Sequence, residues 1–309
     1  MWIVRGLDQY PPDAPPSVVA QGTFDGMHLG HQAVIRTAVE RARALGVRPV
    51  AVTFDPNPLA VLRPAEAPTE ILSLDERLER IADLGPDACL VIPFTAQFAE
   101  VAADAYVEDV LIGLLRAREI VVGFNHAFGR GARGTPELLA RTAGSAGVQV
   151  HVVPPLRVDG LAVSSTSIRE ALRQGDVRQA ASLLGRAYTV RGVVARGAAR
   201  GRTLGFPTAN LAAPPALAVA DGVYAARAGW DGESAPAVVN VGVRPTFDGA
   251  TRLVEAYLLD ASPDLYGRRL TVAFVDHIRG ERRFDSLEAL RAQIVEDVAA
   301  ARRILSPHA

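Results

Sequence analysis

Two histidines lie three residues apart in a glycine-rich segment near the N-terminus of this 309-residue chain. The segment runs from Gly22 to His31, and the pair is His28 and His31. A helix that begins here would project both imidazoles from one side of its first turn. Backbone amides of the glycines and of the helix N-terminus could approach a phosphate, and imidazolium groups could stabilise charge that develops on it. The pattern predicts a phosphate-transfer site.

Two other interpretations of the histidine pair stay open on these residues alone. Histidines at this spacing can bind zinc, although the segment offers neither a cysteine nor a third histidine as a further ligand. The pair could also be structural, with the His28 side chain capping the helix that follows. The length of the segment favours the phosphate-transfer interpretation, because strand, loop and helix signals all occur in the required order.

A second glycine-rich segment, between Arg191 and Leu211, could hold another phosphate group. Its glycines would let the backbone close over phosphates. Thr208 and Asn210 are two residues apart, so an extended chain places their neutral oxygens on one side. Such oxygens suit Mg²⁺, which keeps waters and takes its remaining ligands from protein and nucleotide. The alternative is a glycine-rich turn followed by an edge strand.

The composition excludes several classes of mechanism. The chain contains no lysine, so all 33 of its Lys+Arg residues are arginine. Schiff-base chemistry, a Walker-type phosphate loop and a protein-kinase fold each need a lysine and are excluded. The formal net charge of −1 provides no overall field that would draw the chain to nucleic acid or to an anionic membrane.

Cysteine use and hydropathy predict a soluble cytoplasmic protein. The single cysteine, Cys89, lies in an apolar run and cannot form an internal disulfide. No apolar stretch approaches ~18 residues, and the N-terminus lacks a basic region followed by an apolar one. We expect no nucleic-acid partner, no membrane span, and a monomer or a weak homo-oligomer.

The first half of the chain alternates apolar strand-like runs with helix-like segments. The predicted strands span residues 17–21, 49–54, 87–93, 120–123 and 148–153. The predicted helices span 28–45, 73–84, 95–115 and 176–184, and another begins at Thr135. Near-continuous apolar strands that alternate with helices indicate an α/β fold, a parallel sheet covered by helices on both faces. The loops that follow these parallel strands, the histidine segment among them, would meet at the carboxyl ends of the strands, where ligands bind in such folds.

The pattern changes near Gly185 to short strands separated by turns. These strands span residues 188–195, 223–230, 236–241, 253–259 and 270–277, and a closing helix runs from Asp285 to about Ile304. The spacing predicts a small antiparallel β-barrel. We therefore expect an N-terminal domain of residues 1–185 and a C-terminal domain of residues 186–309.

The segment from Gly22 to His31 resembles the HxGH signature of nucleotidylyltransferases, in the form found in bacterial FAD synthetases. Residues 52–58 resemble the TFDPHP segment of that family, with Asn57 in place of the usual histidine. Residues 123–130 resemble its loop that seats nucleotide and flavin, and residues 163–169 its SSTxIR motif. The resemblance implies catalytic roles for His28, His31 and Arg169, the last as a bidentate clamp on ATP phosphates. It also implies nucleotide contacts by Gly22, Phe24, Asp25, Gly26, Gly30, Asn125, Ser164, Ser165 and Thr166. Without the resemblance, the run from Ser164 to Thr166 would suggest an ordinary N-cap cluster.

Residues 191–211, above all 201–211, resemble the riboflavin kinase signature, and residues 254–260 resemble the VEVHLLD strand of that family. The resemblance implies phosphate contacts by Gly201, Arg202, Thr203, Gly205 and Pro207 and Mg²⁺ binding by Thr208 and Asn210. It assigns Glu255 to orient and deprotonate the ribityl 5′-hydroxyl of riboflavin, as a kinase of an alcohol needs. By its pattern alone, Glu255 would be a solvent-facing strand glutamate.

Together the two resemblances imply a bifunctional riboflavin kinase/FAD synthetase that uses ATP and Mg²⁺. The barrel would phosphorylate riboflavin to FMN, and the α/β domain would adenylylate FMN to FAD and release pyrophosphate. One rival is a protein in which one of the two sites is inactive. A flavin-sensing regulator is a second rival, but it would need an effector module for which no segment is free. A cytidylyl- or pantetheine-type adenylyltransferase would leave the barrel unexplained.

Overall fold

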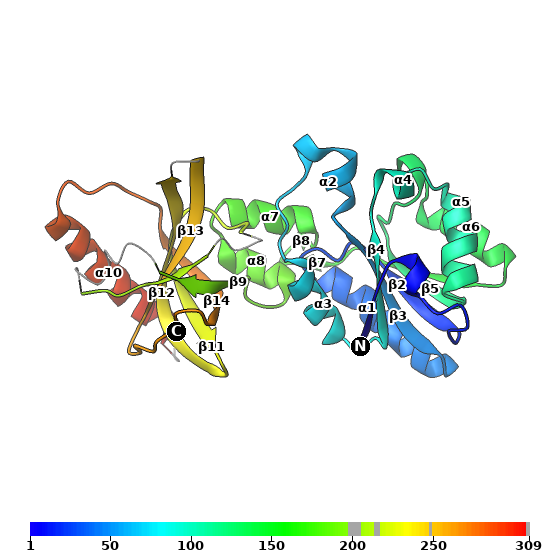
Figure 1. The fold of residues 1–309 in the computed structure, drawn as a ribbon, viewed down its shortest axis with the longest axis horizontal. Helices are drawn as coiled ribbons and strands as arrows, with labels where there is room; N and C mark the ends of the chain where they lie inside the picture. The colour runs from blue at the N-terminus through cyan, green and yellow to red at the C-terminus, as the bar shows by residue number, and fades with distance from the viewer. Residues whose placement is uncertain (197–204, 213–216, 247–248, 307–309) are drawn as a thin grey trace. The chain divides into compact units, whose positions relative to one another are not determined.

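The five predicted N-terminal strands form a parallel sheet together with a sixth, β1 (Trp2–Arg5), which the sequence pattern did not predict. A computed structural model of the chain describes residues 1–196, 205–212, 217–246 and 249–306. The strands are β1 (Trp2–Arg5), β2 (Ser17–Gln21), β3 (Arg48–Asp55), β4 (Ala88–Pro93), β5 (Ala117–Gly123) and β6 (Gln149–Val153). Their order across the sheet is β1-β4-β3-β2-β5-β6. The strands β2, β3, β4 and β5 of this sheet are labelled in Figure 1.

This strand order creates a switch point between β2 and β5. From β2 the chain proceeds through β3 to β4 on one side, and later adds β5 and β6 on the other side. The loops that follow β2 and β5 therefore diverge from neighbouring strand ends, which is where ligands bind in open α/β sheets. The histidine segment follows β2 and residues 124–134 follow β5, so the topology brings two of the predicted segments to one place.

Helices cover both faces of the sheet. One apolar cluster contains residues of α1 (Leu29–Leu45) and α3 (Leu74–Ala82), and a second contains residues of η3 (Tyr106–Leu114) and α6 (Pro136–Ser145). The predicted helix from Ser73 is α3, which begins with a capping box of Ser73 and Glu76. The predicted helix from Thr135 is α6, with Thr135 as its cap. The short elements are η1 (Leu7–Gln9), α2 (Pro58–Leu62), η2 (Pro64–Glu66), α4 (Ala96–Ala99), α5 (Ala103–Ala105), η4 (Arg130–Ala132), β7 (Arg157–Val158) and β8 (Leu161–Ala162).

The single helix predicted over residues 95–115 is wrong. The segment folds as α4, α5 and the π-helix η3, with extended backbone at Ala102. The loop after β5 docks at this break: the amide of Arg130 donates to the carbonyl of Val101 at 2.7 Å. A Cβ on Gly129 would lie 2.6 Å from the Cα of Ala103, so the two backbones are in direct contact. Apolar periodicity within the segment carries no information on such a contact.

The second half of the chain forms a closed barrel of six strands in the order β10-β13-β12-β11-β14-β9, as the turn pattern predicted. The strands are β9 (Thr189–Ala195), β10 (Ala209–Leu211), β11 (Gly222–Trp230), β12 (Glu233–Thr246), β13 (Gly249–Leu258) and β14 (Arg269–Arg279). The predicted closing helix is α10 (Leu287–Leu305), capped by Ser286. Its residues Ala301 and Leu305 pack on an apolar cluster that includes Val223 and Val238.

The chain divides into two compact units, Met1–Ser165 and Thr166–Ala309. The helices α7 (Ser165–Arg173) and α8 (Val177–Leu184) pack with the barrel, because Leu172 accepts a hydrogen bond from the amide of Ala220 at 2.8 Å. Gly185 caps the end of α8 with φ of 70°. Among the described residues, no helix has both the length and the apolar character needed to cross a membrane.

Two carboxylates that meet α10 provide a matched test of burial. Asp297 has a 3% exposed side chain and accepts a bidentate hydrogen bond from Arg279 of β14. Asp260 accepts a bidentate hydrogen bond from Arg302 of α10, but its side chain is 65% exposed. We expect Asp297→Asn to lower the free energy of unfolding of the barrel unit by about 3 kcal/mol, because it leaves a largely buried guanidinium without its counter-charge.

Asp260→Asn is the matched control and should change that free energy little, since water screens the exposed pair. Urea unfolding followed by Trp230 fluorescence, in a Trp2→Phe background, measures both variants. Equal losses of unfolding free energy in the two variants would contradict the expectation that the buried Asp297–Arg279 pair contributes more to stability than the exposed Asp260–Arg302 pair.

Candidate functional site

The loop between β2 and α1 contains three residues with left-handed backbone. Phe24, Gly26 and Met27 have φ values of 54°, 82° and 42°, a region that residues other than glycine rarely adopt. The buried Asp25 secures the loop, because its Oδ1 accepts hydrogen bonds from the amides of Ile71 at 2.9 Å and Leu72 at 3.3 Å. The sequence did not reveal this structural task. The contact of Asp25 with nucleotide stays a prediction.

The two histidines stack at the start of α1. His28 caps the helix, since its Nδ1 accepts a hydrogen bond from the amide of His31 at 3.2 Å. The two imidazole rings are nearly parallel, with centroids 3.5 Å apart. Because Nδ1 is the acceptor, the neutral His28 ring carries its proton on Nε2. His28 therefore caps the helix and also presents an N–H donor, so the capping and phosphate-transfer interpretations are compatible.

Glycines beside the histidine pair let the rings approach the backbone. A Cβ on Gly30 would lie 3.2 Å from the His28 ring, and a Cβ on Gly22 would lie 2.8 Å from the ring of Phe24. Within the described residues, no group of three or more histidine, cysteine, aspartate or glutamate side chains is arranged to hold a metal ion. The described residues therefore provide no third ligand for a zinc ion at the histidine pair.

Ser165 of the SSTxIR segment contacts the histidine loop. The hydroxyl of Ser165 donates to the carbonyl oxygen of Asp25 at 2.8 Å. Ser164 is half-buried and precedes α7, whereas Thr166 and Arg169 lie in α7 and belong to the barrel's compact unit. The predicted roles of Ser164, Thr166 and Arg169 in phosphate binding stay predictions.

The carboxyl ends of β3, β4 and β5 lead into a continuous cluster of aromatic rings. Its members, each in contact with the next, are Phe54, Phe94, Phe98, Tyr106, Phe128 and His126. The terminal pair is stacked, with the His126 and Phe128 rings 5.5 Å apart and 18° from parallel. Asn125, a predicted nucleotide contact, is exposed in the turn directly before His126. The rings of Phe94, Phe98 and His126 are partly exposed, whereas those of Phe54, Tyr106 and Phe128 are buried.

Two buried polar atoms in this aromatic cluster have no hydrogen-bond partner among the described residues: the hydroxyl of Tyr106 and Nε2 of His126. Burial lowers the pKa of His126 to about 4 and raises the pKa of Tyr106. Both side chains are therefore neutral at pH 7, and each could hydrogen-bond a ligand that reaches the cluster. Tyr106 was not among the predicted site residues, because the sequence predicted a single helix over residues 95–115.

The barrel places three of its polar side chains in one row. In the antiparallel register, Asn210 of β10 lies opposite Glu255 of β13, and Glu255 lies opposite Asn240 of β12. All three are half-buried, and their neighbours Leu211 and Val254 are fully buried. Directly opposed side chains have Cβ atoms about 4.5–5.5 Å apart. The row therefore brings the predicted metal ligand Asn210 beside the predicted base Glu255, which is not freely exposed.

The chain before β10 packs on the same part of the barrel. The ring of Phe206 meets Tyr257 of β13 edge-to-face at 5.4 Å, and Nδ2 of Asn210 donates to the carbonyl of Thr208 at 3.4 Å. Gly205 and Pro207 are exposed, and Gly205 has φ of 89°. The other predicted phosphate contacts of this segment, Gly201, Arg202 and Thr203, lie outside the described residues.

A second carboxylate lies over the row. The side chain of Glu281 occupies the space that a side chain on Gly242 would need, and the amide of Asn240 lies within 3.6 Å of the same point. Glycine at 242 is therefore required for this approach. Glu281 carries no local sequence signal, because its position depends on the return of the chain from β14 toward α10.

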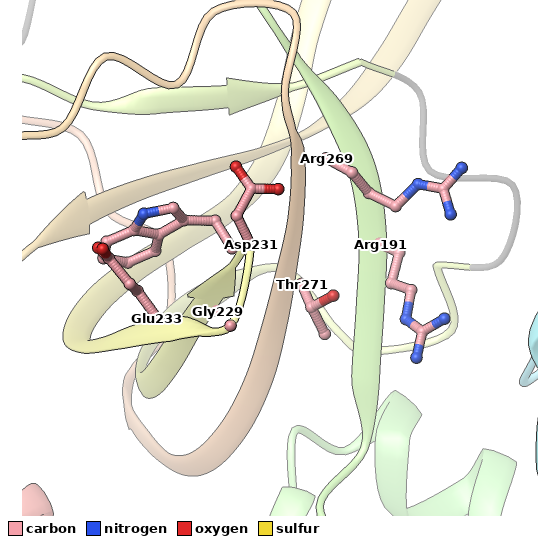
Figure 2. Close-up of a pocket in the computed structure, with 8 residues that line it drawn as sticks. Arg191, Gly229, Asp231, Glu233, Arg269 and Thr271 are labelled. Atoms are coloured by element: carbon pink, nitrogen blue, oxygen red, sulfur yellow. The ribbon is translucent and has the colours of Figure 1, made fainter.

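A shallow pocket of about 440 Å³ lies over the other three barrel strands, β9, β11 and β14, and the hairpin that joins β11 to β12. Figure 2 shows Arg191 and Arg269 projecting from neighbouring strands, away from Asp231 and Glu233. Gly229, Trp230, Gly232 and Thr271 complete its lining. Arg191, the first residue of the second glycine-rich segment, lines the pocket, but none of the described residues with a predicted phosphate, metal or catalytic role does. Asp231 is already paired with Arg268 at 3.2 Å. The pocket is thus separate from the two candidate sites.

Two family models match the chain, one after the other. The model described as FAD synthetase matches residues 10–167, and the model described as riboflavin kinase matches residues 184–305. A curated relative from Pseudomonas fluorescens, named bifunctional riboflavin kinase/FMN adenylyltransferase, is 39% identical over 100% of this chain and 99% of its own. Relatives of the same name from Escherichia coli and Bacillus subtilis are each 36% identical, over 98% and 94% of this chain and 97% and 93% of their own.

A solved structure from Streptococcus pneumoniae superimposes on most of the chain. It is 32% identical, has a TM-score of 0.87 and covers 98% of this chain and 99% of its own, and it is described as a macrolide-efflux protein. That description differs from those of the two family models and the curated relatives, which agree with one another. The shared fold extends over both units.

His126 supplies a pH-dependent test of the aromatic cluster. Its pKa is about 4 in the folded protein and about 6.5 in an unfolded chain. The unfolded state therefore binds the extra proton first, so the stability contributed by neutral His126 is complete above pH ~6.5 and is lost as pH falls toward ~4. His126→Phe keeps an aromatic ring but removes this titration. We expect the variant to unfold at a higher urea concentration than the wild type at pH 5, and by a smaller margin at pH 7.5.

Trp2 fluorescence during urea unfolding at the two pH values, in a Trp230→Phe background, measures this difference for the N-terminal unit. An equal margin at pH 5 and pH 7.5 would contradict the buried, neutral state of His126.

Proposed function

The chain belongs to the family of bifunctional riboflavin kinase/FMN adenylyltransferases, and we propose that it carries out both reactions at the two sites described above. The barrel transfers the γ-phosphoryl group of ATP to riboflavin. The N-terminal sheet transfers the adenylyl group of a second ATP to the FMN that results. The observation that carries this conclusion is the match of two family models to successive parts of the chain, each with side chains suited to its reaction.

In the barrel, we assign the proton transfer to Glu255. Its carboxylate orients the ribityl 5′-hydroxyl and accepts its proton while the hydroxyl oxygen bonds to the γ-phosphorus of ATP. The bond between that phosphorus and the β-phosphate oxygen breaks, and ADP leaves. The register supports this role, because Glu255 lies directly between Asn210 and Asn240, whose amides can position the two substrates.

Both families act on ATP together with a divalent metal ion, and we propose that Mg²⁺ is the ion in the barrel. Thr208 and Asn210 would hold it. Nδ2 of Asn210 donates to the Thr208 carbonyl, which leaves the amide Oδ1 as the oxygen of Asn210 that can bind a cation. Neutral oxygens of this kind suit Mg²⁺ that retains waters and phosphate ligands. When bound, the metal ion neutralises charge on the phosphates.

In the N-terminal unit, an oxygen of the FMN phosphate attacks the α-phosphorus of ATP. The bond from that phosphorus to the β-phosphate oxygen breaks and pyrophosphate leaves, without a covalent enzyme intermediate. Nε2–H of His28 and the ring of His31 supply donors for the charge that develops, since both stand at the N-terminus of α1. Asn125, Ser164, Ser165, Thr166 and Arg169 are proposed to bind the nucleotide, as the sequence predicts.

We propose that the flavin ring binds at the aromatic cluster. Its faces are apolar, and the unpartnered atoms of Tyr106 and His126 could pair with the polar edge of an isoalloxazine. We also propose residue 185 as the boundary between the two functional domains. The start of the riboflavin kinase match at residue 184 and the cap of α8 at Gly185 support it.

Two substitutions should separate the two activities. His28→Asn keeps a side-chain acceptor at the cap of α1 but removes the imidazole, so FAD formation from FMN should fall about 100-fold or more while FMN formation from riboflavin is unchanged. Asn210→Ala should do the reverse, lowering FMN formation while FAD formation from supplied FMN is unchanged. Chromatography of the flavins formed with ATP and Mg²⁺ measures both. Loss of both activities in either variant, or of neither, would contradict the assignment of one site to each unit.

A further inference from the structure

Arg77 of α3 is a buried guanidinium directly beneath the histidine loop. Its side chain is 1% exposed. Its Nη1 donates to the carbonyl of Thr23 at 2.8 Å and to the carbonyl of Phe54 at 3.0 Å, and lies 3.4 Å from the hydroxyl of Thr53. One side chain thus joins the loop that follows β2 to the end of β3.

The positive charge of Arg77 is incompletely compensated. Its Nη2 lies 3.9 Å from a carboxylate oxygen of Asp55 and 3.8 Å from one of Glu70, beyond hydrogen-bond distance. Its Nε and Nη2 are buried and have no hydrogen-bond partner among the described residues. Burial of a charge costs several kcal/mol unless it is well paired. Packing alone therefore does not account for an arginine here, because an apolar side chain of similar length would avoid that cost.

The bond to Thr23 determines which way one peptide unit faces. The Thr23–Phe24 peptide is trans, so the Thr23 carbonyl and the Phe24 N–H point in opposite directions. The hydroxyl of Thr53 also donates to that carbonyl, at 3.0 Å. Two donors thus hold the carbonyl toward β3 and α3, and the Phe24 N–H faces away from them. In the described part of the chain, no acceptor is paired with this N–H.

We propose that Arg77 is a positioning residue for adenylyl transfer: by holding the Thr23 carbonyl, it turns the Phe24 amide toward the polyphosphate of ATP. The proposal rests on the function proposed for the N-terminal sheet. A donor that is oriented before the reaction stabilises charge that develops in the transition state. Loss of the anchor should therefore lower kcat for FAD formation more than it raises KM for ATP.

The test compares four variants of the full chain. Arg77→Met removes the donors and the charge, Arg77→Lys keeps a charge with different geometry, and Thr53→Val removes the second donor to the Thr23 carbonyl. Arg80→Met is the matched control on α3, because Arg80 makes a surface pair with Asp83 at 3.4 Å. For each variant, kcat and KM are measured for FAD formation from FMN and ATP. FMN formation from riboflavin by the same molecules reports on the barrel unit. Urea unfolding followed by Trp2 fluorescence, in a Trp230→Phe background, reports on the folding of the N-terminal unit.

We expect Arg77→Met to lower kcat for FAD formation about 10- to 100-fold, with FMN formation unchanged. Thr53→Val should lower kcat about threefold, Arg77→Lys should fall between the two, and Arg80→Met should match the wild type. If Arg77→Met does not fold, Arg77→Lys and Thr53→Val decide the question. A kcat within twofold of the wild type in the folded anchor variants, even with a lower melting temperature, would overturn the proposal. A wild-type chain that forms FMN but no FAD would instead overturn the proposed adenylyl transfer itself.

Discussion

The loop that joins β2 to α1 has to keep a backbone shape that its own residues disfavour. Phe24 and Met27 both have left-handed φ values, and each such residue costs about 1 kcal/mol or more. The loop therefore needs anchors outside itself. Asp25 bonds to the segment before α3, Arg77 bonds from within α3, and Ser165 bonds from the start of α7. The position of the histidine pair at the end of this loop depends on those contacts.

In the barrel, the register of the strands positions the functional side chains. Asn210, Glu255 and Asn240 come from three strands, and they meet because the antiparallel pairing sets them opposite one another. A shift of one residue in β13 would turn Glu255 to the other face of the sheet. Closure of the barrel and the packing of α10 on its outer surface hold that register. In both units, then, distant parts of the chain fix the chemistry-bearing side chains.

Local signals in the sequence predicted most of the helices and strands, whereas the contacts between them could not be predicted. The capping box of α3, the start of α1 after His28 and the five longer barrel strands each have a signature within a few residues. The strand β10 has three residues, too few for a period, and its place between β13 and β9 could not be predicted. The break near Ala102 depends on a loop that begins more than 20 residues later.

In the two candidate sites, too, local patterns identified single residues but not the contacts between distant residues. The motifs identified His28, His31, Asn210 and Glu255 one by one, because their residue types and spacing suit phosphate chemistry. The anchors Asp25–Ile71 and Arg77–Thr23 join residues 46 and 54 positions apart, and no local pattern encodes such a pairing. Tyr106 was missed for the same reason, since its partner Phe128 comes from another loop.

The central claim is that the two units break different bonds of ATP. The most direct measurement is to incubate the protein with riboflavin and ATP that carries a phosphorus label at either the α or the γ position, and to separate the flavins. We predict that γ-label enters FMN and is retained in FAD, whereas α-label enters FAD alone. Label from the α position in FMN, or FAD that contains no α-label, would contradict the account.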